Sequence, residues 1–494
     1  MIEPVAEGTN VYSLIAMRAR SRPDAPALIA GQTRISYAEL IATADAIAAD
    51  LAARGIRRGD RVAILSENRT EYTLTQIACA KLGIIVACQN WRLALPELQH
   101  CIGLVEAKLL IVSERYKASA DALQLDMPVA DIASLGASGA TRCVAEPEDG
   151  LLIIYTSGTT GLPKAALISH RAEIARMCAL RMDLNIGPED GYVAWAPMFH
   201  MGGTEHLLAA LMSGAHGIVI DGFDAELICD AIADWRIGWL MLVPATIEPL
   251  TSRIRARGIT PKGIRAVGCM ADLVPSGEVA DISRLTRAPY LNSFGATETG
   301  MPPLSGGLIA PGSVPASLDK ELSSLCEIRL IGPDGTEAVG DEPGEAWVRG
   351  PTLFSGYWAA EAANAQCFVD GWFRMGDLFR KTADGYAFVG RSKYLIKSGG
   401  ENIYPAEIER VLLADPRVSD AIVVRRGDDR WGEVPVAVIA RLDESLDAAA
   451  VETMCRAQLA SYKRPRDVVF VALEAFPRSA SGKIVREEVE KMIG

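Results

Sequence analysis

Helical and strand patterns alternate along the first part of this chain, and the alternation limits the folds that it can adopt. The stretch ISYAELIATADAIAADLAARG carries apolar residues at helical spacing and ends on Gly55, a residue suited to the left-handed turn after a helix. The apolar stretch DRVAILSEN follows, and EYTLTQIACAKLG and IIVACQN then repeat the order of helix, glycine and strand. Such alternation predicts βαβ units around a parallel sheet, and therefore an α/β fold.

The pattern changes farther along the chain. Residues 133–150 are polar and predict a loop before the apolar run from Leu151 to Ile154. Alternation continues to about residue 300. Around GEAWVRGPTLFSGYW the strands are shorter and turns are frequent, which predicts a small β-rich, barrel-like subdomain.

Length and charge indicate a domain boundary near residue 391. A chain of 494 residues is too long for one ordinary core, so we expect at least two domains. Residues 391–494 contain 17 basic and 17 acidic side chains, so the whole net charge of −12 lies in residues 1–390. We therefore predict one domain at 1–390 and a second at 391–494.

Composition argues against several classes of function. The acidic net charge disfavours nucleic acid as a partner, because phosphate backbones select basic surfaces. No apolar run approaches the roughly 18 residues that a membrane span needs, and MIEPVAEGTN lacks the basic flank and apolar core of a secretory signal. The ten cysteines form no CxxC pair and offer no zinc-ligand spacing, so we expect free thiols in a cytoplasmic protein.

The stretch YTSGTTGLPKAALISH, directly after the apolar run, has the composition of a phosphate-binding loop. Glycines let backbone N–H groups approach an anion, hydroxyls donate further hydrogen bonds, and a lysine adds positive charge. It is not a Walker A loop, because Gly158 and Gly161 are only three residues apart and Ala165 follows Lys164. The alternative is a surface loop, although three hydroxyls between two glycines exceed what a turn requires.

Six motifs, in order, resemble those of the adenylate-forming enzymes, a superfamily of acyl-CoA synthetases, peptide-synthetase adenylation domains and firefly-type luciferases. They are YTSGTTGLPK, PMFHMGG, NSFGATETG, GWFRMGDL, GRSKYLIKSGGENIYPAEIE and PRSASGK. The resemblance spans nearly the whole chain and is strongest to the acyl-CoA synthetase branch, including 4-chlorobenzoate-, 4-coumarate- and medium-chain fatty acyl-CoA ligases. It implies a small, mobile α+β C-terminal domain that rotates about a hinge at Lys393 between two half-reactions.

The resemblance also implies which residues bind ATP and Mg²⁺. The implied phosphate-binding residues are Thr156, Ser157, Gly158, Thr159, Thr160, Gly161 and Lys164. The implied nucleoside-binding residues are Asn292, Ser293, Phe294 and Gly295 for adenine and Asp377 with Arg391 for ribose. Glu298 and Thr160 are the implied Mg²⁺ ligands, with Thr297 at the α-phosphate. One carboxylate is sufficient for Mg²⁺, and the phenyl ring of Phe294, where tyrosine is common, still stacks on a base.

Further implied roles concern catalysis, the acyl group and CoA. Lys483 would bridge the substrate carboxylate and the α-phosphate, and His200 would lie at the acyl pocket as a gate rather than as a general base. The acyl-pocket candidates are Trp195, Met201, Gly268, Cys269, Met270, Met301 and Pro302. The CoA candidates are Lys397, Ser398, Gly399, Gly400, Glu401, Trp431, Tyr462 and Arg464. Without the resemblance, Glu298, Asp377 and Lys483 would be ordinary surface residues and His200 a core histidine.

We therefore expect a carboxylate–CoA ligase that uses ATP, Mg²⁺ and CoA, as a monomer or homodimer. Its substrate would be an apolar aromatic, alicyclic, medium-chain or bulky polycyclic acid. No acidic residue stands near His200 to pair an amino group, which disfavours an amino-acid substrate. A luciferase, an enzyme with another acceptor and a non-catalytic nucleotide-binding protein remain alternatives. Segment 312–325, GSVPASLDKELSSL, departs from the Gly-x-x-Gly pattern of most ligases.

Overall fold

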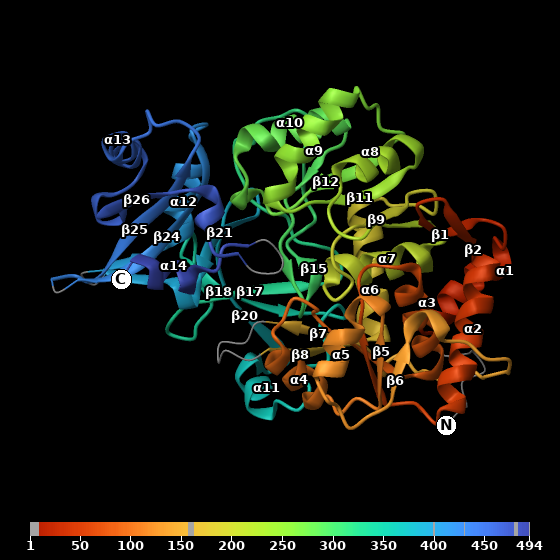
Figure 1. Ribbon diagram of the computed structural model, residues 1–494. Helices are drawn as coiled ribbons and strands as arrows, with labels where there is room; N and C mark the ends of the chain where they lie inside the picture. The colour runs from red at the N-terminus through yellow and green to blue at the C-terminus, as the bar shows by residue number, and fades with distance from the viewer. Residues whose placement is uncertain (1–8, 157–162, 399–400, 429, 479–482, 494) are drawn as a thin grey trace.

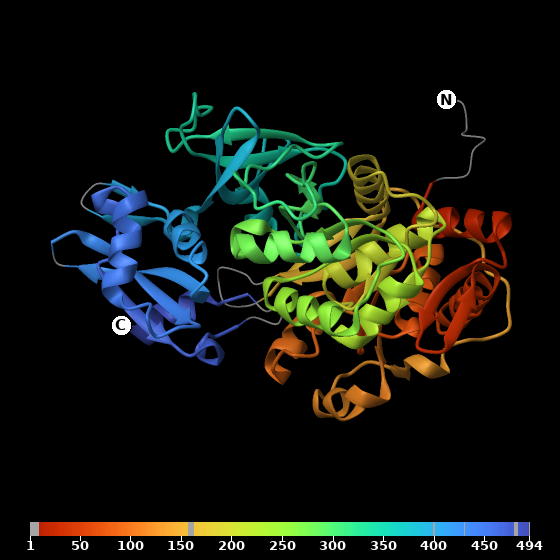
Figure 2. The same cartoon turned by 90° about the horizontal axis from the view of Figure 1, so that it is seen from above.

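The computed structural model describes residues 9–156, 163–398, 401–428, 430–478 and 483–493. Its N-terminal part contains three sheets with helices packed on them and a fourth, antiparallel sheet. The C-terminal part, blue in Figure 1, has a sheet of its own and lies to one side of the N-terminal part. The view from above shows the same separation (Figure 2).

The first sheet has six strands in the order β6-β5-β3-β4-β7-β8 and is parallel except for β8. Its strands are β3 (Arg61–Leu65), β4 (Ile85–Cys88), β5 (Leu109–Val112), β6 (Val129–Asp131), β7 (Gly150–Thr156) and β8 (Lys164–Ser169). The helices predicted before β3 and β4 are α2 (Tyr37–Ala53) and α3 (Thr70–Leu82). They are followed by Gly55 (φ 82°) and Gly83 (φ 64°), so the predicted left-handed turns are confirmed.

Two four-stranded sheets follow, in the orders β2-β1-β10-β9 and β11-β12-β13-β16. Their strands are β1 (Pro26–Ala30), β2 (Thr33–Ser36), β9 (Tyr192–Ala194), β10 (Gly217–Val219), β11 (Ile237–Met241), β12 (Ile264–Gly268), β13 (Tyr290–Leu291) and β16 (Leu308–Ile309). The pairs β9–β10, β11–β12 and β12–β13 are parallel, and a parallel bridge between Gly191 and Ile237 joins the two sheets. The carboxyl ends of β9, β11, β12 and β13 therefore meet along one edge.

Helices cover both faces of these sheets. They are α1 (Val11–Ser21), α4 (Leu95–Leu104), α5 (Lys117–Ala122), α6 (His170–Leu184), α7 (Met201–Ser213), α8 (Ala225–Asp234), α9 (Pro244–Arg257) and α10 (Ser276–Thr286). Helix α2 begins at a capping box in which Ser36 and Glu39 bond each other's backbone N–H groups. The largest core cluster joins α1, α2, α3, α6 and α7 to the sheets between which they lie, and a second cluster packs α8, α9 and α10 on β11 and β12.

The β-rich segment predicted around Gly344 is a five-stranded antiparallel sheet. It consists of β17 (Glu327–Ile331), β18 (Gly344–Arg349), β19 (Phe368–Val369), β20 (Trp372–Lys381) and β21 (Tyr386–Arg391), with α11 (Glu361–Cys367) beside it. A short hairpin of β14 (Gly295–Ala296) and β15 (Gly300–Pro303) connects it to the parallel sheets.

The C-terminal sheet has the order β23-β22-β25-β24, with β26 parallel to β25. Its elements are β22 (Ile396–Ser398), β23 (Glu401–Ile403), β24 (Val418–Asp428), β25 (Gly432–Arg441), β26 (Asp467–Val471), α12 (Pro405–Leu413), α13 (Ala448–Gln458) and α14 (Arg486–Ile493). Separate apolar clusters cover its two faces. The predicted α/β class with a small C-terminal α+β domain is confirmed. Among the described residues, no helix has the length and apolar character needed to traverse a bilayer.

Candidate active site

Three sequence motifs and a segment of acyl-pocket candidates lie where parallel strands end, and they are called the strand-end motifs below. Residues 195–203 follow β9, residues 269–272 follow β12, and residues 292–298 follow β13. The phosphate-loop motif follows β7 in the neighbouring sheet. Ligands of open α/β sheets bind at the carboxyl ends of the strands, so this edge is where a nucleotide site is expected.

The phosphate-loop motif joins two antiparallel strands of the six-stranded sheet. Thr156 ends β7 and pairs with Lys164, which begins β8. The Lys164 ammonium nitrogen lies 5.2 Å from the centre of the Tyr357 ring. The predicted residues Ser157, Gly158, Thr159, Thr160 and Gly161 lie outside the described residues. Thr156 and Lys164 therefore flank the phosphate-loop motif, at the end of the β7–β8 pair where the chain passes from one strand to the other.

Glu298 is held by two hydrogen bonds from the segment around residue 355. The Tyr357 hydroxyl donates a hydrogen bond of 2.7 Å to Glu298 Oε1, and the Phe354 N–H donates to the Glu298 carbonyl at 2.8 Å. Behind the turn, the Arg176 guanidinium donates to the Thr297 carbonyl at 3.1 Å and pairs with Glu205 at 2.6 Å. The turn is thus fixed on both sides, and its carboxylate has a set orientation.

The Glu298 carboxylate suits a magnesium ion. Among the described residues, Oε2 accepts no hydrogen bond from the protein, and Oε1 accepts only the Tyr357 bond. Magnesium commonly takes one or two protein carboxylates together with phosphate oxygens and water. The described residues contain no cluster of three or more His, Cys, Asp or Glu side chains that could hold a metal by themselves. A single carboxylate facing a phosphate site therefore fits this ion.

Replacing Tyr357 with phenylalanine should weaken the use of Mg²⁺·ATP. The change removes one hydrogen bond to a charged group, worth about 1.5–3 kcal/mol, and keeps the ring that Lys164 faces. We expect the half-saturating Mg²⁺ concentration for ATP–pyrophosphate exchange, and for ATP binding, to rise by about tenfold. Tyr386→Phe is the matched control in the antiparallel sheet. An unchanged Mg²⁺ requirement in Tyr357→Phe would show that the hydroxyl does not position Glu298.

The adenine-motif residues lie directly after β13. Phe294 is buried, and its ring packs against Phe379 (centroids 4.7 Å apart) and Phe388 (5.7 Å). Ser293 is half-buried, and Gly295 is exposed on β14. A side chain at Gly295 would collide with the backbone of Gly300. Asn292 is buried, and its amide is bonded to the protein, as described below.

The predicted ribose residues form an ion pair across two adjacent strands. Asp377 on β20 faces Arg391 at the end of β21, and Arg391 Nε donates to Asp377 Oδ1 at 3.0 Å. Asp377 is 2 % exposed, and this burial raises its carboxyl pKa, while the charges of Arg391 and Lys483 act in the opposite direction. A buried, charge-paired carboxylate next to the strand-end motifs is suited to accept two hydroxyl groups.

Lys483 comes from the C-terminal part and lies close to residues of the N-terminal part. An antiparallel bridge joins Arg478 to Ile484, the residue after Lys483. Burial raises the pKa values of Asp377 and Cys269, and the Lys483 charge opposes that rise; at His200 it adds to the lowering of the pKa by burial. The ammonium group therefore lies within electrostatic range of these three residues. Lys483 as a whole residue is exposed. Protein atoms around its ammonium group exclude water, and this loss of hydration, together with the charge of Arg391, lowers the Lys483 pKa. In this orientation of the C-terminal domain, the lysine lies close to Asp377 and Arg391, the predicted ribose residues.

The predicted hinge lies between the last strand of one sheet and the first strand of the next. Lys393 lies in the 3₁₀ turn η4 (Ser392–Tyr394), between β21 and β22. Its ammonium group pairs with Glu487 on α14 at 2.8 Å, and the Tyr394 hydroxyl donates to the same carboxylate oxygen. Glu487 follows Lys483 by four residues, so these contacts tie the hinge to the segment that carries the lysine.

His200 precedes α7, and its environment keeps it neutral. Its ring packs on Phe199 (centroids 4.6 Å apart), and Nε2 is buried with no hydrogen-bond partner among the described residues. Burial lowers the His200 pKa to about 4, assisted by the positive charges of Arg92 and Lys483. At neutral pH the imidazole is therefore uncharged.

This low pKa gives a testable pH dependence. Since His200 stays neutral above about pH 5, the pH profile of adenylation between pH 6 and 9 should have the same shape in wild type and in His200→Asn. The absolute rate of the variant reports any role in packing. A limb near pH 6.5 that is present in wild type and lost in His200→Asn would show that the histidine titrates as a base.

The acyl-pocket candidates divide into two groups. Trp195, Cys269 and Met270 lie near the strand ends, together with half-buried Met201; Trp195 donates its indole N–H to the Met241 carbonyl at 2.8 Å. Gly268 has φ 128°, and a side chain there would collide with the Tyr290 ring, whose hydroxyl lies 3.4 Å from Cys269 Sγ. The second group, Met301 and Pro302 on β15, is buried, and Met301 packs with Trp239 and Leu291.

The CoA candidates gather within the C-terminal domain, around β22 and β23. Ser398 pairs with Gly432, which follows Trp431, and the turn η5 (Ser461–Lys463) that carries Tyr462 contacts β23. The Trp431 ring lies between the guanidinium groups of Arg430 (4.8 Å) and Arg466 (5.5 Å). Lys397 is exposed on β22, and Glu401 begins β23. The Arg464 guanidinium donates to the Leu459 carbonyl. The last two candidates, Gly399 and Gly400, lie outside the described residues.

Sequence reasoning missed three residues that support the site. Tyr357 lies in the stretch SGYW, which gave only a β-rich signal, and Arg176 lies in the helical stretch RAEIARMCALRMD without a distinguishing pattern. Lys320 lies in the atypical segment 312–325 and is completely buried. A single charged or hydroxyl-bearing residue in a sequence gives no sign of the partner that it will contact, so periodicity alone could not find these residues.

Comparison with known proteins agrees with this geometry. Residues 15–358 match the family described as AMP-binding enzyme, and residues 407–483 match the AMP-binding enzyme C-terminal domain. The chain is 35% identical to an indoleacetate–CoA ligase of Aromatoleum aromaticum, over 93% of each chain. Among solved structures, it is similar to o-succinylbenzoate CoA synthetase of Bacillus subtilis in complex with an acyl-adenylate intermediate (TM-score 0.85, 27% identity, 98% of this chain and 99% of that chain). A second structure of that synthetase, with ATP and a magnesium ion, gives a TM-score of 0.83 with 27% identity, over 96% of this chain and 98% of that chain.

Proposed function

Because the chain belongs to the family of AMP-binding enzymes, we propose that the strand-end motifs and Lys483 together form the site at which it activates a carboxylic acid. The enzyme is an ATP-dependent carboxylate–CoA ligase. A carboxylate and ATP give acyl-AMP and pyrophosphate, and acyl-AMP and CoA then give the thioester and AMP. The predicted ligase activity and the predicted use of ATP, Mg²⁺ and CoA are confirmed.

One observation carries the assignment of the site. The Lys483 charge acts on Asp377, Cys269 and His200, which lie on three separate segments of the N-terminal domain. A cation at this place can neutralise charge on the attacking carboxylate and on the α-phosphate as the bond between them forms. Glu298 would hold Mg²⁺, which when bound withdraws charge from phosphate oxygens.

We further propose that the second step uses a different orientation of the C-terminal domain. The CoA candidates around Trp431 and β22 lie on that domain, and in the present orientation Lys483 lies close to Arg391 and Asp377. Rotation about residues 392–394 would withdraw the lysine and bring the β22–β23 loop toward the acyl group. The short turn η4, between two sheets with separate cores, supports a pivot there.

We propose an aromatic carboxylic acid as the substrate, with the reaction taking place in the cytoplasm. Indoleacetate and o-succinylbenzoate, named for the relatives, are aromatic acids. In this chain, the Trp195 indole lies edge-on to Phe223 (centroids 5.5 Å apart), in the same apolar cluster as the acyl-pocket candidate Cys269. These side chains offer an apolar surface to an aromatic ring. All ten cysteines are free thiols, which suits a reducing compartment.

A panel of acids tests the substrate proposal. ATP–pyrophosphate exchange should be measured with arylacetates, benzoates and cinnamates, and in parallel with cyclohexane acids, C4–C16 fatty acids and sterol side-chain acids. We expect exchange with one aromatic class and thioester only when CoA is added. Exchange restricted to fatty or sterol acids would overturn the aromatic assignment. ATP binding without exchange for any acid would favour the non-catalytic alternative.

A further inference from the structure

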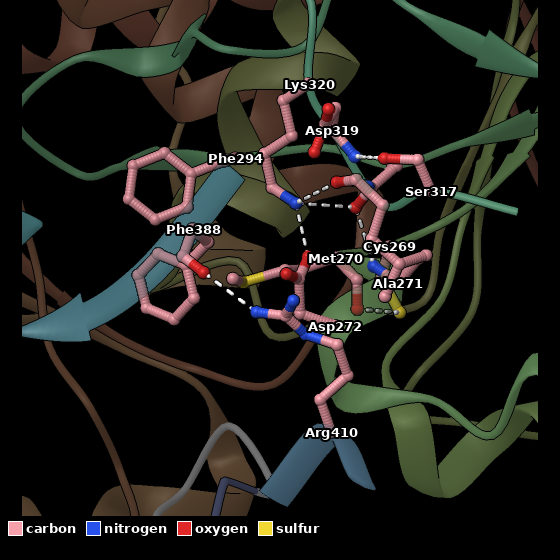
Figure 3. A network of polar contacts seen from close by, with 12 residues as sticks. Cys269, Met270, Ala271, Asp272, Phe294, Ser317, Asp319, Lys320, Phe388 and Arg410 are labelled. Atoms are coloured by element: carbon pink, nitrogen blue, oxygen red, sulfur yellow. Dashed lines mark hydrogen bonds and ion pairs between the residues drawn. The ribbon is translucent and has the colours of Figure 1, made fainter. Parts of the chain in front are cut away.

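A fully buried lysine lies beneath the strand-end motifs (Figure 3). The Lys320 side chain has no solvent exposure, and the residue comes from the segment 312–325, whose sequence departs from that of most ligases. Its ammonium group pairs with the Asp272 carboxylate, and it donates to Asn292 Oδ1 at 3.0 Å and to the Leu318 carbonyl at 3.3 Å. Burial lowers the Lys320 pKa, and the adjacent Asp272 charge opposes this shift.

These contacts join three segments that are distant in sequence. Asp272 belongs to the turn η3 (Ala271–Leu273) after β12, and Asn292 is the first residue after β13. The Ala271 N–H donates to Asn292 Oδ1 at 2.8 Å, and Asn292 Nδ2 donates to the Leu318 carbonyl at 2.8 Å. The Lys320 ammonium group thus fixes the separation between the residues that follow two adjacent parallel strands.

Both lone pairs of the Asn292 carbonyl oxygen are occupied by these bonds. One comes from Ala271 and the other from Lys320, so the oxygen is not left to accept a hydrogen bond from a base. Asn292 is also only 4% exposed. The residue therefore acts on a nucleotide through the position of its neighbours Ser293 and Phe294.

The backbone of Lys320 is anchored independently of its side chain. Its N–H and C=O groups both bond to Tyr386 on β21, at 2.9 and 3.0 Å. The chain opposite is so close that a side chain at Gly385 would collide with the Lys320 carbonyl. A change of the side chain should therefore leave segment 312–325 attached to β21.

Two candidate site residues lie next to the η3 and Asn292 segments that Lys320 contacts. Met270, an acyl-pocket candidate, packs in the same cluster as Phe294, the residue expected to stack on adenine. Buried ion pairs contribute little net stability, because loss of hydration offsets their attraction. The Lys320–Asp272 pair is therefore better explained by the position that it imposes on η3 and Asn292 than by a gain in stability.

We propose that Lys320 is a positioning residue that sets nucleotide affinity, by holding η3 and Asn292 at the spacing that the adenine of ATP requires. This inference rests on the proposed function, because it takes the strand-end motifs as the ATP site. It assigns a role to segment 312–325, and Lys320 itself touches no substrate.

The test compares Lys320→Met with Lys381→Met. Lys381 is an exposed lysine on β20 whose Cα partner, Tyr386, also pairs with Lys320, so the control makes the same chemical change nearby. In Lys320→Met we expect both the Kd for ATP, measured by calorimetry without turnover, and the KM for ATP to rise by about tenfold. The kcat at saturating ATP should change by less than about threefold, since no group that contacts the reacting atoms is removed.

Asp272→Asn provides a second variant if Lys320→Met does not fold. It keeps the lysine and weakens the same contact, so its Kd for ATP should also rise. If Lys320→Met does fold, the effects of the two changes should not multiply in the double variant. Unchanged ATP affinity together with a lower Tm would overturn the proposal and leave the pair a purely structural role. Normal ATP binding without exchange in wild type would instead count against the proposed function.

Discussion

Lys483→Ala is expected to slow adenylation by about 10²–10³-fold, the range measured when one charge-stabilising donor is removed from an active site. In the orientation described here, the ammonium group lies among Asp377, His200 and Cys269, where the carboxylate would attack the α-phosphate. The second half-reaction, from preformed acyl-AMP and CoA, should keep most of its rate, because the lysine would have left the site by then.

The two half-reactions of Lys483→Ala should be measured separately, by ATP–pyrophosphate exchange and by thioester formation from synthetic acyl-AMP. Lys491→Ala, an exposed lysine on α14 of the same terminal segment, is the matched control and should behave as wild type. Equal losses in both half-reactions would contradict a role restricted to adenylation.

Lys393→Pro should block thioester formation and spare adenylation. The proposed rotation must be absorbed by backbone dihedrals in η4, and proline fixes φ near −65°. Residues of a 3₁₀ turn have a similar φ, so proline can adopt the φ expected of residue 393 in the present orientation. We expect thioester formation from acyl-AMP to fall by about 100-fold, which corresponds to roughly 2.7 kcal/mol of barrier.

Lys393→Ala separates the backbone from the side chain. It removes the ion pair with Glu487 but leaves φ free, so it should lose far less thioester formation than Lys393→Pro. If Lys393→Pro carries out both half-reactions at the wild-type rate, the pivot is not at this residue. If both variants lose the same amount, the ion pair rather than the backbone is responsible.

The sequence was sufficient to predict the order of elements and the location of the motifs. Helices α2 and α3 lie where periodicity and the following glycines indicate, because local propensity and burial agree there. The motifs at residues 195–203 and 292–298 follow parallel strands, and parallel strands place their carboxyl ends at one edge. Local patterns of this kind depend only on nearby residues.

The supports of the site could not be predicted in the same way. Tyr357 reaches Glu298, Arg176 reaches Thr297, and Lys320 reaches Asn292 across long sequence separations. Each contact depends on how separate sheets pack, and one charged or hydroxyl-bearing residue gives no periodic signal. Asn292 illustrates the limit, because its motif suggests contact with adenine while its amide oxygen is bonded entirely to protein.

The most direct test of the central claim, activation of a carboxylate through an acyl-adenylate, is to follow its oxygen. The enzyme should be given ATP, Mg²⁺, CoA and the best acid of the panel, labelled with ¹⁸O in both carboxylate oxygens, and the products analysed by mass spectrometry. Attack of the carboxylate on the α-phosphate forms a C–O–P bond, and thiolysis then breaks the acyl C–O bond. One ¹⁸O atom should therefore appear in AMP for each thioester formed. Label in inorganic phosphate, or AMP without label, would contradict the account.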